Sequence, residues 1–226
     1  MVTGGDPKSQ AVKTEVIDAK DPTKTCNSLP DFPYQDYWMA NGGVLNGKII
    51  VCQAVKCFQL QNNGNGWTEF ATNTNNHKYG AGTVVNDALF VFAGYETTSS
   101  PYSEFVYSNG STEHGPDLDI TTGKDYGMCL VTLSSGNIMV MGGYKNAKRV
   151  GLFNPTTGSY ISKGGMNFER KYSACTVFYS AKHGNREVVY VGGGYQTDSC
   201  KTAELLDYTV TEEWEQSKLI LKLQFH

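Results

Sequence analysis

The sequence predicts an all-β protein made of repeated units of four antiparallel strands. Three observations lead to this prediction. Short apolar runs of strand length recur, turn residues separate them, and the whole pattern returns about every 45 residues. Glycine and polar turn residues are abundant, with 25 glycines among 226 residues, whereas helix signals are scarce.

One unit, residues 134–165, contains the clearest form of the pattern. Its turn at Ser135-Gly136-Asn137 is of the kind that closes a hairpin. A continuous apolar run follows, as expected for a strand that is covered on both faces, and Gly142-Gly143 ends it. Called a to d, the four expected strands are residues 126–133, residues 138–141, residues 150–153 and a strand that begins at Tyr160.

The other units share four positions with this one. A tyrosine opens strand a at Tyr37, Tyr79, Tyr126 and Tyr172. Strand b ends at Gly4-Gly5, Cys52-Gln53, Ala93-Gly94, Gly142-Gly143 and Gly193-Gly194. Strand c begins at Glu15, Cys57, Glu104, Gly151 and Glu204. An aromatic residue or a substitute for one then follows at Cys26, Trp67, His114, Tyr160 and Trp214.

This combination resembles the Kelch repeat: a double glycine, a Glu-aliphatic-aliphatic-Asp strand and a tryptophan, with a period just under 50 residues. The resemblance covers residues 1–214 and implies a β-propeller in which each repeat forms one four-stranded blade. Two units depart from the pattern. Cys52-Gln53 stands where glycines are expected, and the third unit has no tryptophan.

The resemblance implies a single Kelch propeller over residues 1–216. Its five blades are expected at about residues 1–33, 35–73, 77–118, 124–165 and 170–216. The first blade is expected to lack its innermost strand, because the chain begins inside strand b. Residues 217–226 form a tail with two alternatives. Residues 219–225 pair with residues 1–4 and close a five-bladed ring, or the chain is a fragment of a larger propeller. The tail lacks the Tyr-x-small pattern of the other a strands, which favours a fragment.

Composition excludes several classes of partner. The net charge is −3 and there is no basic stripe, which argues against nucleic acid. No apolar run approaches the length of a membrane span, so no span is predicted.

The cysteines give separate expectations. Cys52 and Cys57 flank a very short b–c loop, where cross-strand neighbours can reach disulfide distance, so we expect a bridge. Cys129 and Cys175 occupy the same position on successive a strands and are expected to be small buried hydrophobes rather than a pair. The pairing of Cys26 and Cys200 stays open. The expected bridge, with a glycosylation triplet at Asn109, favours an extracellular over a cytoplasmic setting by a small margin.

Candidate binding residues come from two columns of the repeat. Tyrosines directly follow the double glycines at Tyr95, Tyr144 and Tyr195. Two residues before the strand-a tyrosines lie Gln35, His77, Lys124 and Arg170. In ligand-binding Kelch domains these columns line a pocket at one mouth of the central channel. By resemblance, the candidates are Tyr95, Tyr144, Tyr195 and Arg170, with Arg149 in a neighbouring b–c loop. The alternative is that the tyrosines pack over strand ends and that Arg149 is structural.

We therefore expect a non-catalytic module that binds a protein or peptide through the loops at one mouth. No cofactor or metal is predicted, because the four histidines lie in different units or loops and no nucleophile has a flanking signature. Two alternatives remain. A copper oxidase resembling galactose oxidase needs tyrosine and histidine ligands and a cysteine–tyrosine crosslink, and that set cannot be located here. A substrate adaptor of a ubiquitin ligase needs an additional oligomerisation domain.

Overall fold

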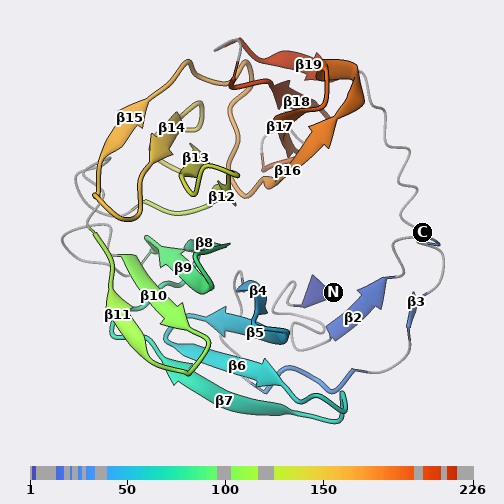
Figure 1. The fold of residues 1–226 in the computed structure, drawn as a ribbon, viewed down its shortest axis with the longest axis vertical. Helices are drawn as coiled ribbons and strands as arrows, with labels where there is room; N and C mark the ends of the chain where they lie inside the picture. The colour runs from blue at the N-terminus through green and yellow to red at the C-terminus, as the bar shows by residue number, and fades with distance from the viewer. Residues whose placement is uncertain are drawn as a thin grey trace.

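The computed structural model forms a β-propeller, with antiparallel sheets standing around a common centre (Figure 1). The structure describes residues 2–3, 14–17, 21, 25–26, 29–33, 40–95, 103–116, 125–195, 201–209 and 213–217. Within them, the only helical turn is the short 3-10 segment η1 (Ala181–His183), so the predicted all-β class is confirmed.

Four blades contain four strands each, in sequence order from the centre outwards. Blade two consists of β4 (Asn41–Leu45), β5 (Lys48–Gln53), β6 (Lys56–Leu60) and β7 (Trp67–Thr72). Blade three consists of β8 (Ala81–Val85), β9 (Ala88–Phe92), β10 (Ser103–Tyr107) and β11 (Thr112–His114). Blade four consists of β12 (Met128–Thr132), β13 (Ile138–Gly142), β14 (Val150–Phe153) and β15 (Tyr160–Ser162). Blade five consists of β16 (Ala174–Ser180), β17 (Arg186–Gly192), β18 (Ala203–Leu206) and β19 (Glu215–Ser217).

Blade one has three strands among the described residues: β1 (Val2–Thr3), β2 (Thr14–Ile17) and β3 (Thr25–Cys26). They correspond to the expected b, c and d strands. The expected pairing of residues 219–225 with residues 1–4 lies outside the described residues, apart from β1, which pairs with β2. Gln35, Tyr37, Lys124 and Cys200 also lie outside them.

The strand-a tyrosines do not begin strands, which corrects one expectation. In blades three, four and five the innermost strand starts two residues after its tyrosine, at Ala81, Met128 and Ala174. Tyr79 and Tyr172 have φ of 62° and 57°, in the left-handed region that a β-strand does not use. These two tyrosines therefore belong to the end of the incoming connector and not to the strand.

Apolar clusters between neighbouring blades hold the ring together. Strands β9 and β13 are buried along their whole length, as the continuous apolar run at residues 138–141 predicted. In the cluster between blades three and four, the Phe90 ring lies 5.5 Å from that of Phe153, and Ile138 and Val140 pack beside them. Fully burying a side chain of this size contributes about 1.5–3 kcal/mol relative to leaving it exposed.

Trp67 and Trp214 contact the connectors between blades. Trp67 donates a hydrogen bond from Nε1 to the Pro30 carbonyl at 3.0 Å. Its ring lies 5.1 Å from that of Phe32, which also packs against Phe58 at 5.2 Å. Trp214 is buried against the cluster between blades four and five. The tryptophan column is therefore structural, and blade three has the exposed His114 at this position.

Candidate functional site

Three tyrosines from successive blades meet at the end of the innermost strands. The ring centroids of Tyr79, Tyr126 and Tyr172 lie 5.8, 6.1 and 6.3 Å apart. The backbone joins them across the blades, because Gly127 donates its N–H to the Tyr79 carbonyl at 3.0 Å and Tyr172 donates to the Gly127 carbonyl at 2.8 Å. The three rings therefore form a common floor at one mouth of the propeller.

Three further tyrosines surround this floor. They are the residues that follow the double-glycine column: Tyr95, Tyr144 and Tyr195. Their ring contacts are Tyr95 with Tyr79 at 5.9 Å, Tyr144 with Tyr126 at 4.7 Å and Tyr195 with Tyr172 at 6.4 Å. The exposed fractions of the three are 45%, 52% and 80%.

The chain reaches this geometry through its turn conformations. Ala93, Gly142 and Gly193 end their b strands with φ of 60°, 66° and 68°. The next tyrosine then donates its backbone N–H back to the start of its own blade, as Tyr195 does to the Lys171 carbonyl at 2.8 Å. The structure thus brings the three predicted tyrosines together. It also adds the inner three, which the sequence had marked only as a repeat column.

Two phenols of the floor, those of Tyr126 and Tyr172, have a raised pKa. Burial raises the pKa of Tyr126, and the neighbouring phenols of Tyr144, Tyr95 and Tyr79 raise it further. Burial raises the pKa of Tyr172 to about 12, again with help from the surrounding tyrosines. The phenols of Tyr126 and Tyr172 are therefore neutral at physiological pH. One cation touches the mouth, since Lys171 Nζ lies 4.4 Å from the Tyr144 ring centroid.

Arg170, a predicted binding residue, is fully buried and belongs to the framework. Its Nε donates to Glu204 Oε1 at 3.1 Å, and Nη1 donates to the carbonyls of Gly193 and Thr202. Glu204 also accepts the backbone N–H groups of Asn167 and Phe168. The guanidinium therefore joins the b–c region of blade five to the connector from blade four, and does not reach the surface of the mouth.

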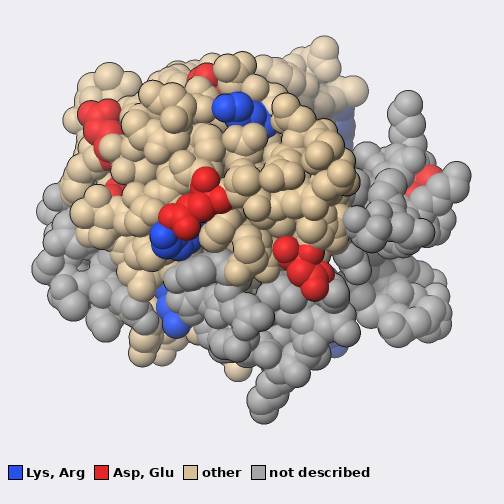
Figure 2. Space-filling view, turned by 90° about the horizontal axis from the view of Figure 1, so that it is seen from below, with Lys and Arg blue, Asp and Glu red and all other residues tan. Residues whose placement is uncertain are grey.

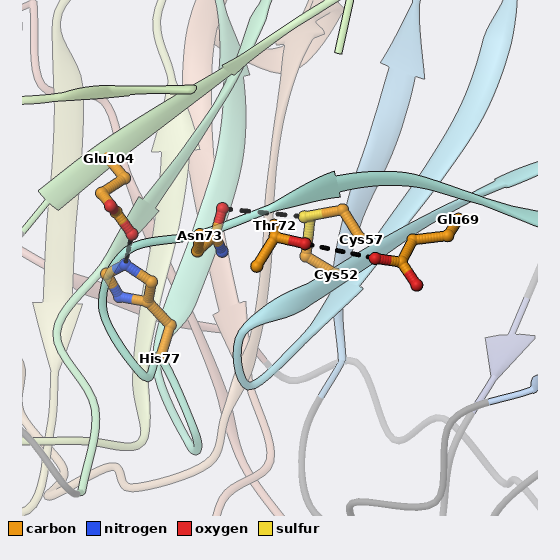
Figure 3. The surroundings of a disulfide bond; sticks show 7 residues. All are labelled: Cys52, Cys57, Glu69, Thr72, Asn73, His77 and Glu104. Carbon is orange, nitrogen blue, oxygen red and sulfur yellow. Dashed lines mark hydrogen bonds and ion pairs between the residues drawn. A yellow bond between two sulfur atoms is a disulfide. The ribbon is translucent and has the colours of Figure 1, made fainter. Parts of the chain in front are cut away.

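His77 occupies the same column and has the same kind of role (Figure 3). Its Nε2 lies 2.9 Å from Glu104 Oε2, and its Nδ1 lies 2.8 Å from the Ala93 carbonyl. Glu104 also accepts the N–H groups of Thr74 and Asn75 at 2.8 and 3.1 Å. Burial by itself raises the pKa of Glu104, but the bond to His77 and the backbone donors outweigh it and hold the pKa below its ordinary value.

Arg149 does not lie among the exposed tyrosines either. Its Nη1 donates to Asp125 Oδ2 at 2.6 Å, and only 6% of its side chain is exposed. Asp125 Oδ1 accepts the N–H groups of Tyr126 and Lys145. These contacts match the alternative that Arg149 is a structural residue.

Two disulfides are present among the described residues. Cys52–Cys57 closes the b–c hairpin of blade two, as predicted, with a Cα–Cα distance of 3.9 Å (Figure 3). Cys129 and Cys175 were expected to stay unpaired, and this was wrong. They join β12 to β16 with a Cα–Cα distance of 6.0 Å. The two cysteines reach each other because the innermost strands of neighbouring blades lie side by side. Disulfides persist in oxidising compartments.

Neither a patch of one charge in the view of Figure 2 nor a metal-ligand cluster among the described residues marks a further site. In the view of Figure 2, acidic and basic side chains are scattered over the described surface instead of forming a patch of one sign. Within the part of the chain that the structure describes, no three His, Cys, Asp or Glu side chains come together as a metal site would require. No helix of the described chain is long and apolar enough to cross a membrane.

Fold and site together define a β-propeller with an aromatic surface at one mouth. No protein-family model matches the chain, and no curated protein matches it. Among solved structures, the chain is similar to one titled "Structure of YjhT", with a TM-score of 0.63 and 13% sequence identity. The match covers 84% of this chain and 67% of that one. At this identity the likeness supports the propeller fold alone.

Proposed function

We propose that this protein is a non-catalytic recognition module of the Kelch type, which binds a peptide or protein partner on the tyrosine mouth. The observation that carries the proposal is the continuous surface of six tyrosines from three blades, half of them exposed. Exposed tyrosines on a rigid support are typical interface anchors, since a large ring is buried on binding with few rotatable bonds to order.

The support beneath the rings adds to this argument. The exposed Tyr144 and Tyr195 rest on the rings of Tyr126 and Tyr172. The backbone at these two inner tyrosines is tied to the preceding blade, because Gly127 donates to the Tyr79 carbonyl and Tyr172 donates to the Gly127 carbonyl. A partner would therefore meet a pre-formed surface, and pre-organisation lowers the entropic cost of binding. The neutral phenols and the nearby Lys171 ammonium suit a partner with apolar or aromatic side chains and no excess positive charge.

The two disulfides support an extracellular setting for this recognition, because small secreted and surface domains keep such bridges oxidised.

Selection of phage-displayed random peptides on the immobilised chain tests the proposal. Enriched peptides are expected to lose roughly tenfold or more in affinity when Tyr144→Ala removes a central ring. The matched control is Tyr179→Ala, since Tyr179 is also an exposed tyrosine, 64% accessible, but lies toward the far end of β16 from the mouth. Peptides that bind both variants equally well, or that lose affinity equally to both, would contradict the proposal.

A further inference from the structure

Blade four lacks a carboxylate that blades three and five contain at one position of the repeat. Glu104 pairs with Val91 on β9, Glu204 pairs with Val191 on β17, and Gly151 pairs with Val140 on β13. Each partner valine lies three residues before the second glycine of its own double-glycine column, so the three positions are equivalent. Both glutamates are buried and accept hydrogen bonds from backbone N–H groups and from a basic side chain.

The missing side chain at Gly151 leaves room that Tyr160 takes. A Cβ at Gly151 would overlap the Tyr160 hydroxyl, so the phenol lies over the glycine. The Tyr160 ring packs at the edge of the cluster between blades three and four. Its hydroxyl has no hydrogen-bond partner among the described residues and is not sealed from solvent. A phenol donor therefore lies close to the place where a glutamate would begin in the other blades.

A cavity of about 320 Å³ opens beside this phenol. Its lining includes Lys148, Arg149 and Lys163, together with Asn146, Tyr160 and Ser162. No Asp or Glu is among the described residues that line it. Burial raises the pKa of Tyr160, and the charge of Arg149 partly offsets this, so phenol and guanidinium lie near each other.

The Arg149 guanidinium has donors left for a ligand. Its contacts to Asp125 and to the Met128 sulfur both come from Nη1. Within the described part of the chain, Nε and Nη2 of Arg149 have no acceptor. Both atoms are accessible to solvent. Asp125 cannot turn to meet them, because it is fully buried and its other oxygen holds the N–H groups of Tyr126 and Lys145.

We propose that this cavity in blade four binds a carboxylate group supplied from outside the chain, held by the free edge of Arg149, the Tyr160 hydroxyl and the Lys148 ammonium. The group would lie in the cavity beside the Tyr160 phenol, which itself covers the position where Glu104 and Glu204 begin in the other blades. Arginine presents a planar fork of donors that matches a carboxylate, and charge-assisted bonds of this kind are the strong ones. The carboxylate can belong to a small free acid or to an acidic side chain of a partner. The site does not depend on the tyrosine mouth.

Nitrogen-15 NMR of the full chain tests this directly. The arginines are Arg149, Arg170 and Arg186, so few Nε–H signals have to be assigned. Titration with sodium succinate is expected to shift the Arg149 signal saturably, against sodium chloride at the same ionic strength. Arg170 is buried in its own pair and Arg186 is bonded to Asp207, so both serve as internal references. An Arg149 signal that stays still, or moves only as the other two do, overturns the proposal.

Three variants of the site and one control sharpen the test. Tyr160→Phe keeps the ring in the apolar cluster, removes one hydroxyl and is expected to weaken succinate binding roughly tenfold. Lys148→Ala should weaken it less, and Lys182→Ala, an exposed lysine on η1, should leave it unchanged. Gly151→Glu supplies the carboxylate from the chain and should abolish the succinate shift. If this last variant fails to fold, the other two still decide, because unchanged affinity in both overturns the proposal.

A pair of short peptides separates the two sources of the carboxylate. If acetyl-Gly-Glu-Gly-amide shifts Arg149 more strongly than succinate does, and acetyl-Gly-Gln-Gly-amide does not, the group belongs to a partner's side chain. If succinate alone acts, it belongs to a small acid. Failure of both acids overturns the site without touching the peptide-selection result.

Discussion

The junction between blades two and three and the junction between blades four and five use one architecture with different chemistry. In both, a buried glutamate from strand c accepts two backbone N–H groups of the incoming connector. In both, a basic side chain two residues before the strand-a tyrosine completes the site. That side chain is His77 in one junction and Arg170 in the other.

The two basic side chains differ in their other hydrogen-bond partners. Arg170 reaches Gly193 and both the carbonyl and the hydroxyl of Thr202, whereas His77 has one further contact, to the Ala93 carbonyl. Covalent links differ as well. The Cys129–Cys175 bridge crosses from blade four to blade five, while Cys52–Cys57 stays inside one hairpin. A guanidinium keeps its charge across the pH range of folded proteins. The four–five junction is therefore expected to be the more rigid of the two.

Arg170→Ala should have the largest effect on stability. It leaves the Glu204 carboxylate buried without its cation, and removal of one partner from a buried pair costs about 3–5 kcal/mol. Urea unfolding followed by tryptophan fluorescence measures the loss. Lys182→Ala breaks an exposed pair with Glu215 and should leave the midpoint unchanged. Similar midpoints for the two variants would show that Arg170 is not a structural element.

The two disulfides should contribute different amounts to stability, because they close loops of different length. The bridges enclose sequence separations of 46 and 5 residues, so the chain-entropy model assigns about 4 kcal/mol to Cys129–Cys175 and about 2 kcal/mol to Cys52–Cys57. Double serine variants of each pair, compared by thermal unfolding, measure the two losses. An equal loss, or a larger one for the hairpin bridge, would contradict the comparison.

Acid should weaken the two–three junction through Glu104. Its folded pKa lies below the ordinary value of 4.5, so the carboxylate contributes stability that is fully present above pH 4.5 and is lost as the pH falls through the folded pKa. Glu104→Gln removes this titration at a cost of about 1–3 kcal/mol at neutral pH. Unfolding free energies measured across the acid range should fall less steeply in the variant. If the curves of unfolding free energy against pH run parallel for the two proteins, a group other than Glu104 causes the acid sensitivity.

The mouth should tolerate substitution best. Tyr195 is 80% exposed, so Tyr195→Ala is expected to change stability by no more than about 0.5 kcal/mol. Differential scanning calorimetry measures this against the wild type. A loss comparable with that of Arg170→Ala would mean that the outer tyrosines belong to the framework of the junctions and are not a surface available to a partner.

Patterns of nearby residues in the sequence were enough to predict much of the fold. Alternating and continuous apolar runs, turn residues and the repeat predicted strands, the number of sheets and the class of fold, because each depends on neighbours a few residues apart. The Cys52–Cys57 bridge was predictable for the same reason, since a tight hairpin brings its two ends together. The three exposed tyrosines followed from one position of the repeat.

Features that depend on how blades meet could not be derived in this way. Cys129 and Cys175 lie 46 residues apart and pair because the curvature of the ring places β12 beside β16. The inner tyrosines looked like strand residues, but they precede the strands, two of them with left-handed backbone, and their rings meet one another. Arg170 and Arg149 carry the residue type of an interface anchor, but each pairs with a buried carboxylate, Glu204 or Asp125. A side chain's partner across a blade junction is set by packing between distant segments, and no pattern within one repeat records it.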